Sequence, residues 1–298
     1  MKILIVGEDF KPQSGGVAEL THLYAKGFRE KDDEVLVVAC KKEKSESFDE
    51  SQKYDVERIS SAKKDRGFVK HRLKKEKLKK IVKKFNPEFI LINYVGIHIG
   101  HLPLAAAAAA KSAGIPFGIL AHGMEFLEGG LVPRILRAWT AAGASVIFGS
   151  SSFTARLARS EPFIFSDVSV VNPGIDTSEA VHSSVKSGFA EEIGMDEGFN
   201  IGTLSRLVER KGHSSVIKSM PKIVKKYPKT RYFIAGTGKY EKKLKKVAVT
   251  HGVKNNVSFL GRLDEKYKYP FMKMCDIFAM PSKKAGSSVE GFGIVFVE

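Results

Sequence analysis

The first forty residues of the chain read MKILIVGEDFKPQSGGVAELTHLYAKGFREKDDEVLVVAC, from Met1 to Cys40. Two short runs in this stretch, Ile3–Val6 and Val35–Cys40, are apolar at every position rather than at every second one. Such runs are typical of parallel strands that helices cover on both faces. Between them, a glycine-containing loop leads into residues that are apolar at helical spacing: Leu20, Leu23, Tyr24 and Phe28. The stretch therefore predicts a strand–helix–strand unit of an α/β fold.

The same alternation continues along the chain, with a break in the middle. Strands are expected at 88–93, 117–121, 145–148 and 168–171, with helices between them. The stretch 175–199 has no sustained period and is interpreted as a connection with one short helix. A second alternation then begins, with strands expected at 200–204, 232–235, 257–260 and 277–280. The chain is therefore predicted to form two doubly wound parallel sheets, in Rossmann-like domains at 1–173 and 174–298.

The composition excludes several classes of protein. The 298 residues are 43% hydrophobic and 28% charged, which excludes a disordered or fibrous chain. Cys40 and Cys275 lie far apart, so neither a disulfide framework nor a thiolate metal site is expected. No signal-peptide core is visible, and the longest apolar stretch, Leu102–Ala110, is well short of the ~20 residues of a membrane-spanning helix. We expect a cytoplasmic protein, soluble or held peripherally on the inner face of the cell membrane.

One segment, 63–84, is strongly basic. It contains twelve Lys or Arg residues and only two acidic ones, and it supplies most of the net charge of +16. A surface helix packed on the sheet is predicted here, because the following residues lie near one helical face: Val69, Leu73, Ile81, Val82 and Phe85. The basic side could in addition contact an anionic membrane surface or a charged acceptor. Nucleic acid is disfavoured as a partner, since no nucleic-acid-binding motif accompanies the charge.

The loops that follow strands are where a site is expected, because ligands of parallel sheets bind at the carboxyl ends of the strands. After the first strand, Gly15 and Gly16 lack side chains, so that backbone N–H groups can approach a phosphate or a sugar. A tight turn would explain the same pair. The loop has neither G-x-G-x-x-G nor the Lys-Ser/Thr pair of a P-loop, which disfavours a Rossmann dehydrogenase and an NTPase.

Charged residues follow two strands of the second half. Arg206 and Lys211 lie in the sequence SRLVERKG, 205–212, at the start of a predicted helix, where two cations suit a diphosphate. Further on, Glu290 and Glu298 have E-x7-E spacing. If Glu290 begins a helix, the two carboxylates are about 12 Å apart along its axis. That separation suits two carboxylates that bind distant parts of one extended ligand, such as the diols of its sugars, better than it suits a catalytic acid/base pair.

In order and spacing, these residues resemble the motifs of family 4 glycosyltransferases, from end to end of the chain. The stretches that carry the resemblance are Gly15-Gly16, His122-Gly123, Asn172-Pro173-Gly174-Ile175-Asp176, Arg206 with Lys211, Gly236-Thr237-Gly238, Phe259-Leu260-Gly261, Pro281-Ser282, and Glu290-Gly291-Phe292-Gly293 with Glu298. The resemblance implies the GT-B fold and retaining transfer of a hexose from GDP-mannose or a UDP-sugar to a lipid-linked or polysaccharide acceptor. The turn His122-Gly123-Met124-Glu125 is most similar to the phosphatidylinositol mannosyltransferase branch.

The resemblance also implies roles for individual residues. Arg206 and Lys211 would neutralise the departing diphosphate, and His122 would contact the donor sugar near its reacting face. The remaining donor-binding positions are Glu290 with Gly291, Phe292 and Gly293 for the hexose, Glu298 for the ribose, Gly15 and Gly16 for the phosphates and sugar, and Gly261 and Arg262 beside the base. A loop histidine without a role is the alternative for His122. The family works without a metal, and this sequence has no D-x-D triplet, so neither a metal nor another cofactor is expected.

Two features depart from the family pattern. Asn172-Pro173-Gly174 stands where an Asn-Gly pair is common, so the turn between the domains is expected to differ in shape. Family members also continue beyond the second glutamate, whereas this chain stops at Glu298. We expect a C-terminally truncated chain of uncertain activity, with apolar surface exposed around Ile294–Val297.

Other functions remain open at this stage. They are a nucleotide-sugar epimerase of the same fold, a non-catalytic remnant that binds nucleotides or membranes, and, least favoured, a nucleic-acid-binding protein. The Arg206/Lys211 and E-x7-E pairs favour the transferase over the epimerase. The sequence leaves the donor base, the sugar, the acceptor and the oligomeric state open.

Overall fold

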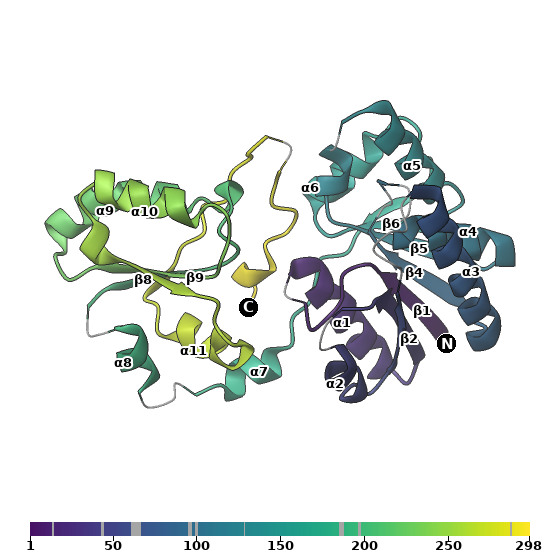
Figure 1. The fold of residues 1–298 in the computed structure, drawn as a ribbon, viewed down its shortest axis with the longest axis horizontal. Helices are drawn as coiled ribbons and strands as arrows, with labels where there is room; N and C mark the ends of the chain where they lie inside the picture. The colour runs from purple at the N-terminus through teal and green to yellow at the C-terminus, as the bar shows by residue number, and fades with distance from the viewer. Residues whose placement is uncertain are drawn as a thin grey trace. The chain divides into compact units, whose positions relative to one another are not determined.

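The chain forms two units, each built on its own parallel sheet (Figure 1). The computed structural model describes residues 1–13, 15–42, 45–60, 67–94, 97–98, 101–127, 129–184, 188–195, 198–286 and 288–298. The first unit comprises Met1–Ile175 with Gly291–Ile294, and the second comprises Asp176–Glu290 with Val295–Glu298. The predicted class, α/β with two parallel sheets, is confirmed.

The sheet of the first unit has the strand order β3-β2-β1-β4-β5-β6-β7. Its strands are β1 (Lys2–Gly7), β2 (Glu34–Cys40), β3 (Asp55–Ile59), β4 (Phe89–Asn93), β5 (Phe117–Ala121), β6 (Val146–Gly149) and β7 (Val168–Val170). In β1, Leu4 and Val6 belong to one apolar cluster, and Ile3 and Ile5 belong to another. Because side chains alternate between the two faces of a strand, a sheet that is covered on both faces requires such unbroken apolar runs.

Helices cover both faces of this sheet. On the face of Ile3 and Ile5 lie α1 (Gly16–Arg29) and α2 (Ser45–Glu50), which contribute Ala25 and Phe48 to the cluster. On the opposite face lie α3 (Gly67–Phe85), α4 (Leu102–Ala113), α5 (Leu131–Ala141) and α6 (Ser152–Arg159), which contribute Leu78, Ala107, Ala141 and Ala158. Ser151 caps the N-terminus of α6, because its Oγ accepts the Thr154 N–H at 3.1 Å.

The alanine-rich helix α4 brings its backbone close to the sheet. Residues 105–110 are all alanine, and none of them is more than 5% exposed. Their methyl groups allow α4 to lie against β1 and β4 while it packs along α3. The helix ends at Gly114, whose φ of 67° is the left-handed conformation that glycine adopts without strain.

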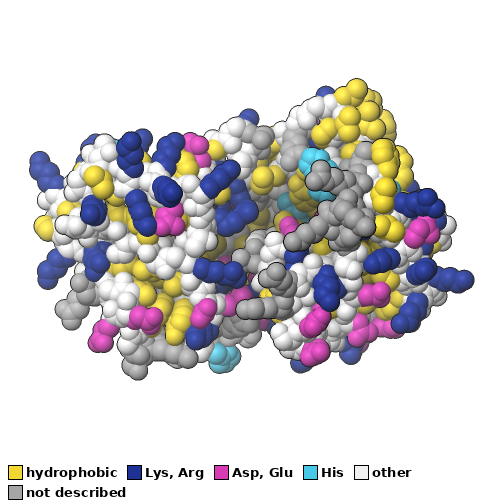
Figure 2. Space-filling view, viewed as in Figure 1, with side chains coloured by type: hydrophobic (Ala, Val, Ile, Leu, Met, Phe, Trp, Pro, Cys, Tyr) yellow, Lys and Arg dark blue, Asp and Glu magenta, His cyan; other side chains and the backbone are white. Residues whose placement is uncertain are grey.

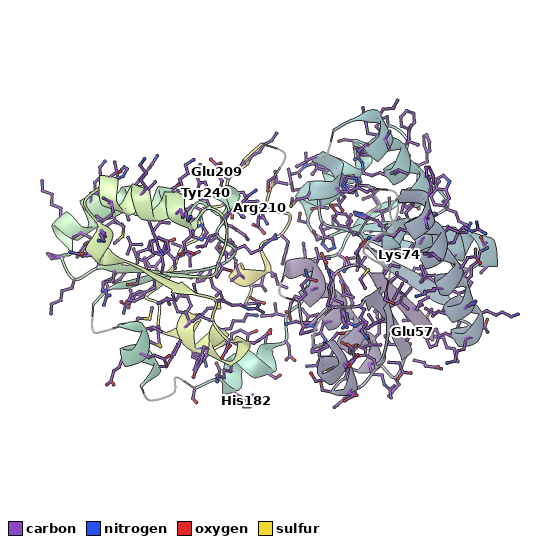
Figure 3. All side chains as sticks on the ribbon, in the orientation of Figure 1. Glu57, Lys74, His182, Glu209, Arg210 and Tyr240 are labelled. Atoms are coloured by element: carbon purple, nitrogen blue, oxygen red, sulfur yellow. The ribbon has the colours of Figure 1, made fainter. Side chains whose placement is uncertain are left out.

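The basic helix α3 differs in part from its prediction. Residues 63–66 lie outside the described residues. The C-terminal half packs on the sheet as predicted, through Ile81, Val82 and Phe85. Val69 and Leu73, however, are 60% and 45% exposed. Lys74, which Figure 3 labels, is buried instead, with its side chain only 1% exposed, because its ammonium pairs with the Glu8 carboxylate at 2.9 Å just after β1. An ion pair, rather than apolar contact, therefore fixes the N-terminal half of α3.

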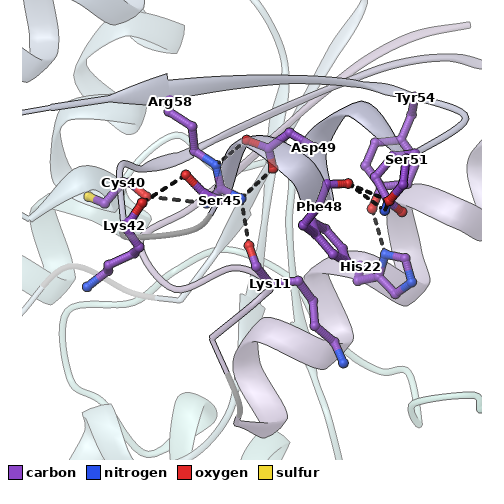
Figure 4. Close-up of polar contacts among 11 residues, drawn as sticks. Lys11, His22, Cys40, Lys42, Ser45, Phe48, Asp49, Ser51, Tyr54 and Arg58 are labelled. Carbon is purple, nitrogen blue, oxygen red and sulfur yellow. Dashed lines mark hydrogen bonds and ion pairs between the residues drawn. The ribbon is translucent and has the colours of Figure 1, made fainter. Parts of the chain in front are cut away.

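A polar network ties α2 and the loop after β1 to the edge of the same sheet (Figure 4). Arg58, in β3, donates to both carboxylate oxygens of Asp49 on α2, at 2.6 and 2.9 Å. Its guanidinium also donates to the carbonyl oxygens of Lys11, at 2.6 Å, and Cys40, at 3.3 Å. Because the Arg58 side chain is only 8% exposed and bidentate, it holds the loop that leads to α1 in a defined position.

The second unit has the strand order β10-β9-β8-β11. Its strands are β8 (Asn200–Leu204), β9 (Arg231–Ala235), β10 (Val257–Gly261) and β11 (Ile277–Phe278). Helices α9 (His213–Lys226) and α10 (Glu241–Thr250) cover one face, and α8 (Phe189–Ile193) and α11 (Lys268–Lys273) cover the other (Figure 1). The remaining elements are α7 (Thr177–His182) and the 3₁₀ turns η1 (Met124–Leu127), η2 (Glu209–Lys211), η3 (Lys254–Asn256), η4 (Glu265–Tyr267) and η5 (Ile294–Phe296).

The prediction that Glu290 begins a helix is wrong. In the described part of 288–298, the helical element is the short turn η5, four residues further on. Gly293 has a φ of 79°, a left-handed conformation that interrupts a helix, and Gly291 is a second poor helix former. The predicted 12 Å axial spacing of the two glutamates therefore does not apply. Of the apolar residues that follow, Phe296 and Val297 are exposed, as predicted, whereas Val295 is buried.

Gly149→Ala should destabilise the first unit. A Cβ at this position in β6 would lie 2.7 Å from the backbone nitrogen of Ala155 in α6, so the strand or the helix would have to move. We expect a loss of about 1–3 kcal/mol of unfolding free energy. The matched control is Gly27→Ala in the last turn of α1, where nothing lies within 4 Å of the Cβ position and alanine is favoured by up to about 1 kcal/mol. Urea denaturation should show midpoints that shift in opposite directions; equal shifts would contradict the packing.

Candidate functional site

In the first unit, polar residues follow three strands at the carboxyl edge of the sheet. Glu8 follows β1, Asn93 is the last residue of β4, and His122 follows β5. The three strands are parallel and lie side by side in the order β1-β4-β5. All three residues therefore reach the same edge of the sheet. His122 was predicted from the sequence, whereas Glu8 and Asn93 were not.

The side chain of His122 is held by Asn93. Its Nε2 lies 2.5 Å from Asn93 Oδ1, and its ring stacks on Tyr94, with the ring centroids 6.2 Å apart. Asn93 is fully buried, and its Nδ2 donates to Thr21 Oγ1 and, at 3.1 Å, to the carbonyl oxygen of Val17. Burial lowers the pKa of His122 to about 4, so the imidazole is neutral at pH 7.

A second buried group, Glu125, supports the backbone of the same turn. Its Oε1 accepts the His122 N–H at 2.7 Å, and the side chain is fully buried. Its Oε2 has no hydrogen-bond partner among the residues that the structure describes. Burial raises the pKa of Glu125 to about 7, although backbone hydrogen bonds and the charge of Arg137 act in the opposite direction. His122 is therefore held on two sides, through its ring and through its backbone.

The predicted glycines of the first unit are of two kinds. Gly15 and Gly16 stand at the start of α1, and nothing lies within 4 Å of the Cβ position of either. Gly15 has a φ of 152°, which side chains rarely adopt, so its backbone conformation requires glycine although its surroundings are open. At Gly291, by contrast, a Cβ would collide with the carbonyl oxygen of His122, while the Gly291 carbonyl accepts from Ser151 Oγ at 2.6 Å. Phe292 is half-buried and Gly293 is buried.

In the second unit, the loops after β8 and β9 are held together (Figure 3). The Leu207 N–H donates to the Thr237 carbonyl at 2.9 Å, and the Tyr240 N–H donates to the Leu207 carbonyl at 3.1 Å. A Cβ on Gly236 or Gly238 would collide with the carbonyl oxygen of Ser205 or Leu207, respectively. The Gly236-Thr237-Gly238 turn thus has glycine at the two positions where its backbone contacts the backbone of 205–207. This contact fixes the position of the loop that carries Arg206 and Lys211.

Two buried cations of that loop share one carboxylate. Lys211 Nζ lies 2.6 Å from Glu290 Oε2, and Arg210, which Figure 3 labels, pairs with the same oxygen. The Arg210 and Lys211 side chains are only 9% and 11% exposed. Burial lowers the pKa of Lys211, while Glu290 raises it, and the charges of Arg210 and Arg206 add to the lowering. The structure therefore brings together two predicted residues, Lys211 and Glu290, with Arg206 near them.

Arg210 was missed by the sequence analysis. It adjoins Lys211 in the same SRLVERKG stretch, but only its burial distinguishes it from the many surface cations of this chain. The other predicted residues of this unit have hydrogen-bond or ion-pair partners other than Arg210, Lys211 and Glu290, or are exposed. Glu298 pairs with Lys268 of α11 at 2.6 Å; Gly261, with a φ of 69°, accepts the Gly236 N–H; and Arg262 is exposed.

Three further properties of the described residues limit the chemistry of the site. These residues contain no group of three or more His, Cys, Asp or Glu side chains that could hold a metal ion. In the same residues, every helix is too short or too polar to cross a membrane. Cys40 and Cys275 are both free, and burial raises the pKa of each thiol, to about 12 for Cys275. Both are therefore poor nucleophiles at neutral pH.

Comparison with known proteins gives matches in both units. The family model described as Glycosyltransferase Family 4 matches residues 14–179, more than half of the chain, and the one described as Glycosyl transferases group 1 matches 190–298. The crystal structure of Anabaena Alr3699/HepE in complex with UDP and glucose superposes with a TM-score of 0.78 and 20% identity, covering 100% of this chain and 77% of that one. This likeness confirms the expected GT-B fold.

Two curated relatives are mannosyltransferases. This chain is 44% identical to a GDP-mannose-dependent monoacylated alpha-(1-6)-phosphatidylinositol monomannoside mannosyltransferase of Corynebacterium glutamicum. The match extends over 96 residues, which are 32% of this chain. Over 129 residues, 42% of the chain, it is 34% identical to a GDP-mannose-dependent alpha-(1-6)-phosphatidylinositol monomannoside mannosyltransferase of Mycolicibacterium smegmatis. The matched stretches span 25% and 34% of the lengths of these two relatives.

Glu125→Gln should stabilise the first unit at alkaline pH. Because the pKa of Glu125 is raised from 4.5 to about 7 on folding, folding favours the protonated form. The stability that this form contributes is complete below pH 4.5 and is lost as the pH rises through 7. Glutamine stays neutral and keeps an oxygen for the His122 N–H. We therefore expect the variant to exceed the wild type by about 2–3 kcal/mol in unfolding free energy at pH 8.5, and to match it at the acid end.

Urea denaturation at several pH values checks this expectation. Glu30→Gln, at the exposed C-terminal end of α1, is the control, and its difference from the wild type should not vary with pH in this way. If the Glu125→Gln difference is the same at pH 4.5 and pH 8.5, then Glu125 is not a buried neutral acid.

Proposed function

The chain belongs to glycosyltransferase family 4, and on that premise we propose that it transfers a hexose from a nucleotide-diphosphate sugar to a lipid-linked acceptor, with retention of configuration. The cationic loop after β8 carries the proposal, because Arg206, Arg210 and Lys211 gather there in the second unit. GDP-mannose is the first donor to test, since the two relatives above are GDP-mannose-dependent. A UDP-sugar is the second, since HepE was crystallised with UDP and glucose.

Charge development on the diphosphate explains why cations are needed. When the bond between the anomeric carbon and the diphosphate oxygen breaks, negative charge grows on the leaving group. Fixed positive side chains stabilise that charge more in the transition state than in the ground state, so they lower the barrier. Arg206 suits this role, because it is exposed and makes no ion pair within the described part of the chain. We therefore expect transfer to proceed without an added metal.

Glu290 has a supporting part in this proposal. The sequence resemblance gave it the donor hexose, but in this structure its carboxylate neutralises Arg210 and Lys211. Two cations that are so little exposed would repel each other without it, and removal of one partner from a buried ion pair typically costs about 3–5 kcal/mol. We infer that Glu290 keeps Lys211 charged and in place for the diphosphate.

Surface features of the first unit support a lipid acceptor. Besides its basic side chains, α3 exposes Phe68, Val69 and Leu73. In Figure 2, hydrophobic side chains also gather over α5, where Leu131, Val132, Ile135 and Trp139 are exposed at helical spacing. Exposed apolar rows beside basic residues are typical of helices that lie in a membrane interface. We propose that the segment 63–84 and α5 hold the protein peripherally at an anionic membrane surface.

Arg206→Met should lower transfer from GDP-mannose without unfolding the protein. Because Arg206 is exposed and unpaired within the described residues, its loss removes only the stabilisation of the leaving group. We expect kcat/KM to fall about 10²–10³-fold. Lys218→Met, an exposed lysine on the adjoining helix α9, is the control and should leave kcat/KM near that of the wild type. Radiolabelled mannose transfer to a lipid extract measures both, and equal rates for Arg206→Met and the wild type would reject the leaving-group role.

The double variant Lys80→Glu/Lys84→Glu should weaken binding to anionic vesicles. Each basic residue near an anionic surface contributes about 1 kcal/mol, so reversing two of them should lower the partition coefficient at least roughly 30-fold. Lys242→Glu/Lys246→Glu, on exposed positions of α10, makes the same change in net charge and should have little effect. Vesicle co-sedimentation at low and high salt measures the binding. Equal binding to neutral vesicles, or equal losses in the two double variants, would contradict a membrane surface at α3.

A further inference from the structure

The hydrogen bonds around Asn93 form a chain whose direction is fixed from one end. Thr21 Oγ1 donates its single proton to the carbonyl oxygen of Val17, at 2.9 Å, so this hydroxyl can only accept from Asn93. Asn93 Nδ2 also lies 3.1 Å from the same Val17 oxygen, which has no proton to give. The amide nitrogen of Asn93 must therefore face Thr21 and Val17, and its Oδ1 must face His122.

This direction decides where the proton of His122 lies. Asn93 Oδ1 can only accept a hydrogen bond, and His122 Nε2 is 2.5 Å from it. Nε2 therefore carries the proton, and because the imidazole is neutral, Nδ1 is left with a lone pair. The opposite tautomer would require Asn93 to turn its amide, which would break its hydrogen bonds to Thr21 and Val17. Glu125, the titratable neighbour in the same turn, contacts the backbone N–H of His122.

A strained residue adjoins this chain. Tyr94, which follows Asn93 directly, has a φ of 91°, a conformation that residues other than glycine rarely adopt. Its N–H donates to the Leu120 carbonyl at 2.8 Å, and its ring stacks on His122 at an interplanar angle of 20°. Such strain persists where the surroundings over-determine a conformation, and it is concentrated at functional sites. Here it sets the plane of the His122 ring.

We propose that Asn93 is a positioning residue, which fixes the tautomer and the ring plane of His122 so that Nδ1 accepts a hydrogen bond from a hydroxyl group of the donor sugar. The part about the sugar rests on the proposed function. A neutral acceptor suits this task, because a hexose hydroxyl donates readily to an imidazole lone pair, whereas an imidazolium could only donate. Buried Asn93 would thus act on the substrate through His122, without touching it.

Imidazole ¹H–¹⁵N correlation spectra of the histidine-labelled full chain test the tautomer without any substrate. The His122 signals, assigned by their loss in His122→Gln, should show a protonated Nε2 and an unprotonated Nδ1 from pH 5.5 to pH 8. In Asn93→Leu, which has no acceptor, the two neutral tautomers should become mixed. Thr140→Val is the control, since it also deletes a buried hydrogen bond of the first unit, between Thr140 Oγ1 and the Leu136 carbonyl, and should leave the His122 signals unchanged.

Asn93→Asp adds a readout that does not depend on stability alone. Its carboxylate keeps an acceptor opposite Nε2, so the Nε2–H tautomer should persist. The added negative charge should also raise the pKa of His122 and move the acid limb of the kcat/KM profile to higher pH. Asn93→Leu should lower kcat roughly 10- to 100-fold, while Thr140→Val should not. A purely structural role of Asn93 would leave the Nε2–H tautomer of His122 unchanged in Asn93→Leu.

The possible failures are distinguishable. A protonated Nδ1 in the wild type, or His122 signals that are unchanged in Asn93→Leu, would overturn the positioning role whatever the enzyme's substrate. The expected spectra together with unchanged kcat and pH profile in the Asn93 variants would overturn the contact between Nδ1 and the sugar. The expected spectra with no transfer from any nucleotide-diphosphate sugar would leave the positioning of His122 in place and reject the proposed function.

Discussion

Parallel pairing of the strands is the constraint on which the rest of this structure depends. It requires helices on both faces, so the inner strands of the sheets are largely apolar, and the polar residues of the candidate site end or follow such strands. It also brings every strand end in a sheet to the same edge. Asn93 and His122 in the first unit, and Arg206 and Lys211 in the second, occupy such positions. The chemistry of each unit is therefore gathered by the topology of its sheet.

The two edges have opposite electrostatic character. Around His122 the ionisable groups are driven toward their neutral forms, because burial lowers the pKa of the imidazole and raises that of Glu125. Around Glu290 two cations remain paired with one carboxylate, so the cluster keeps a positive charge. A neutral polar edge suits hydroxyl groups, and a cationic edge suits a diphosphate. The two units therefore offer different chemistry at the carboxyl edges of their sheets.

The fold was predictable from periodicity, whereas the site was predictable only in part. Unbroken apolar runs identified the strands, because a strand that is covered on both faces has apolar side chains at every position. Lys74, Asn93, Glu125 and Arg210 were missed, since their burial depends on partners far away in the sequence, such as Glu8 for Lys74. Conversely, spacing alone suggested a helix at Glu290, where the backbone of Gly293 prevents one. Polar residues at the end of an apolar run, as at Asn93, are the signal that a closer reading would have used.

The alanines of α4 limit how this protein can evolve. A helix that meets the sheet through methyl groups has no rotamers to adjust, so a larger side chain there cannot be absorbed by its neighbours and must displace the whole helix. The first N–H of α4, at Leu102, is hydrogen-bonded at 3.0 Å to the Glu8 carboxylate that also binds Lys74. A displacement would therefore be felt at the end of β1 and in α3 at once. Larger residues at 105–110 should therefore be accepted only together with compensating changes at these contacts.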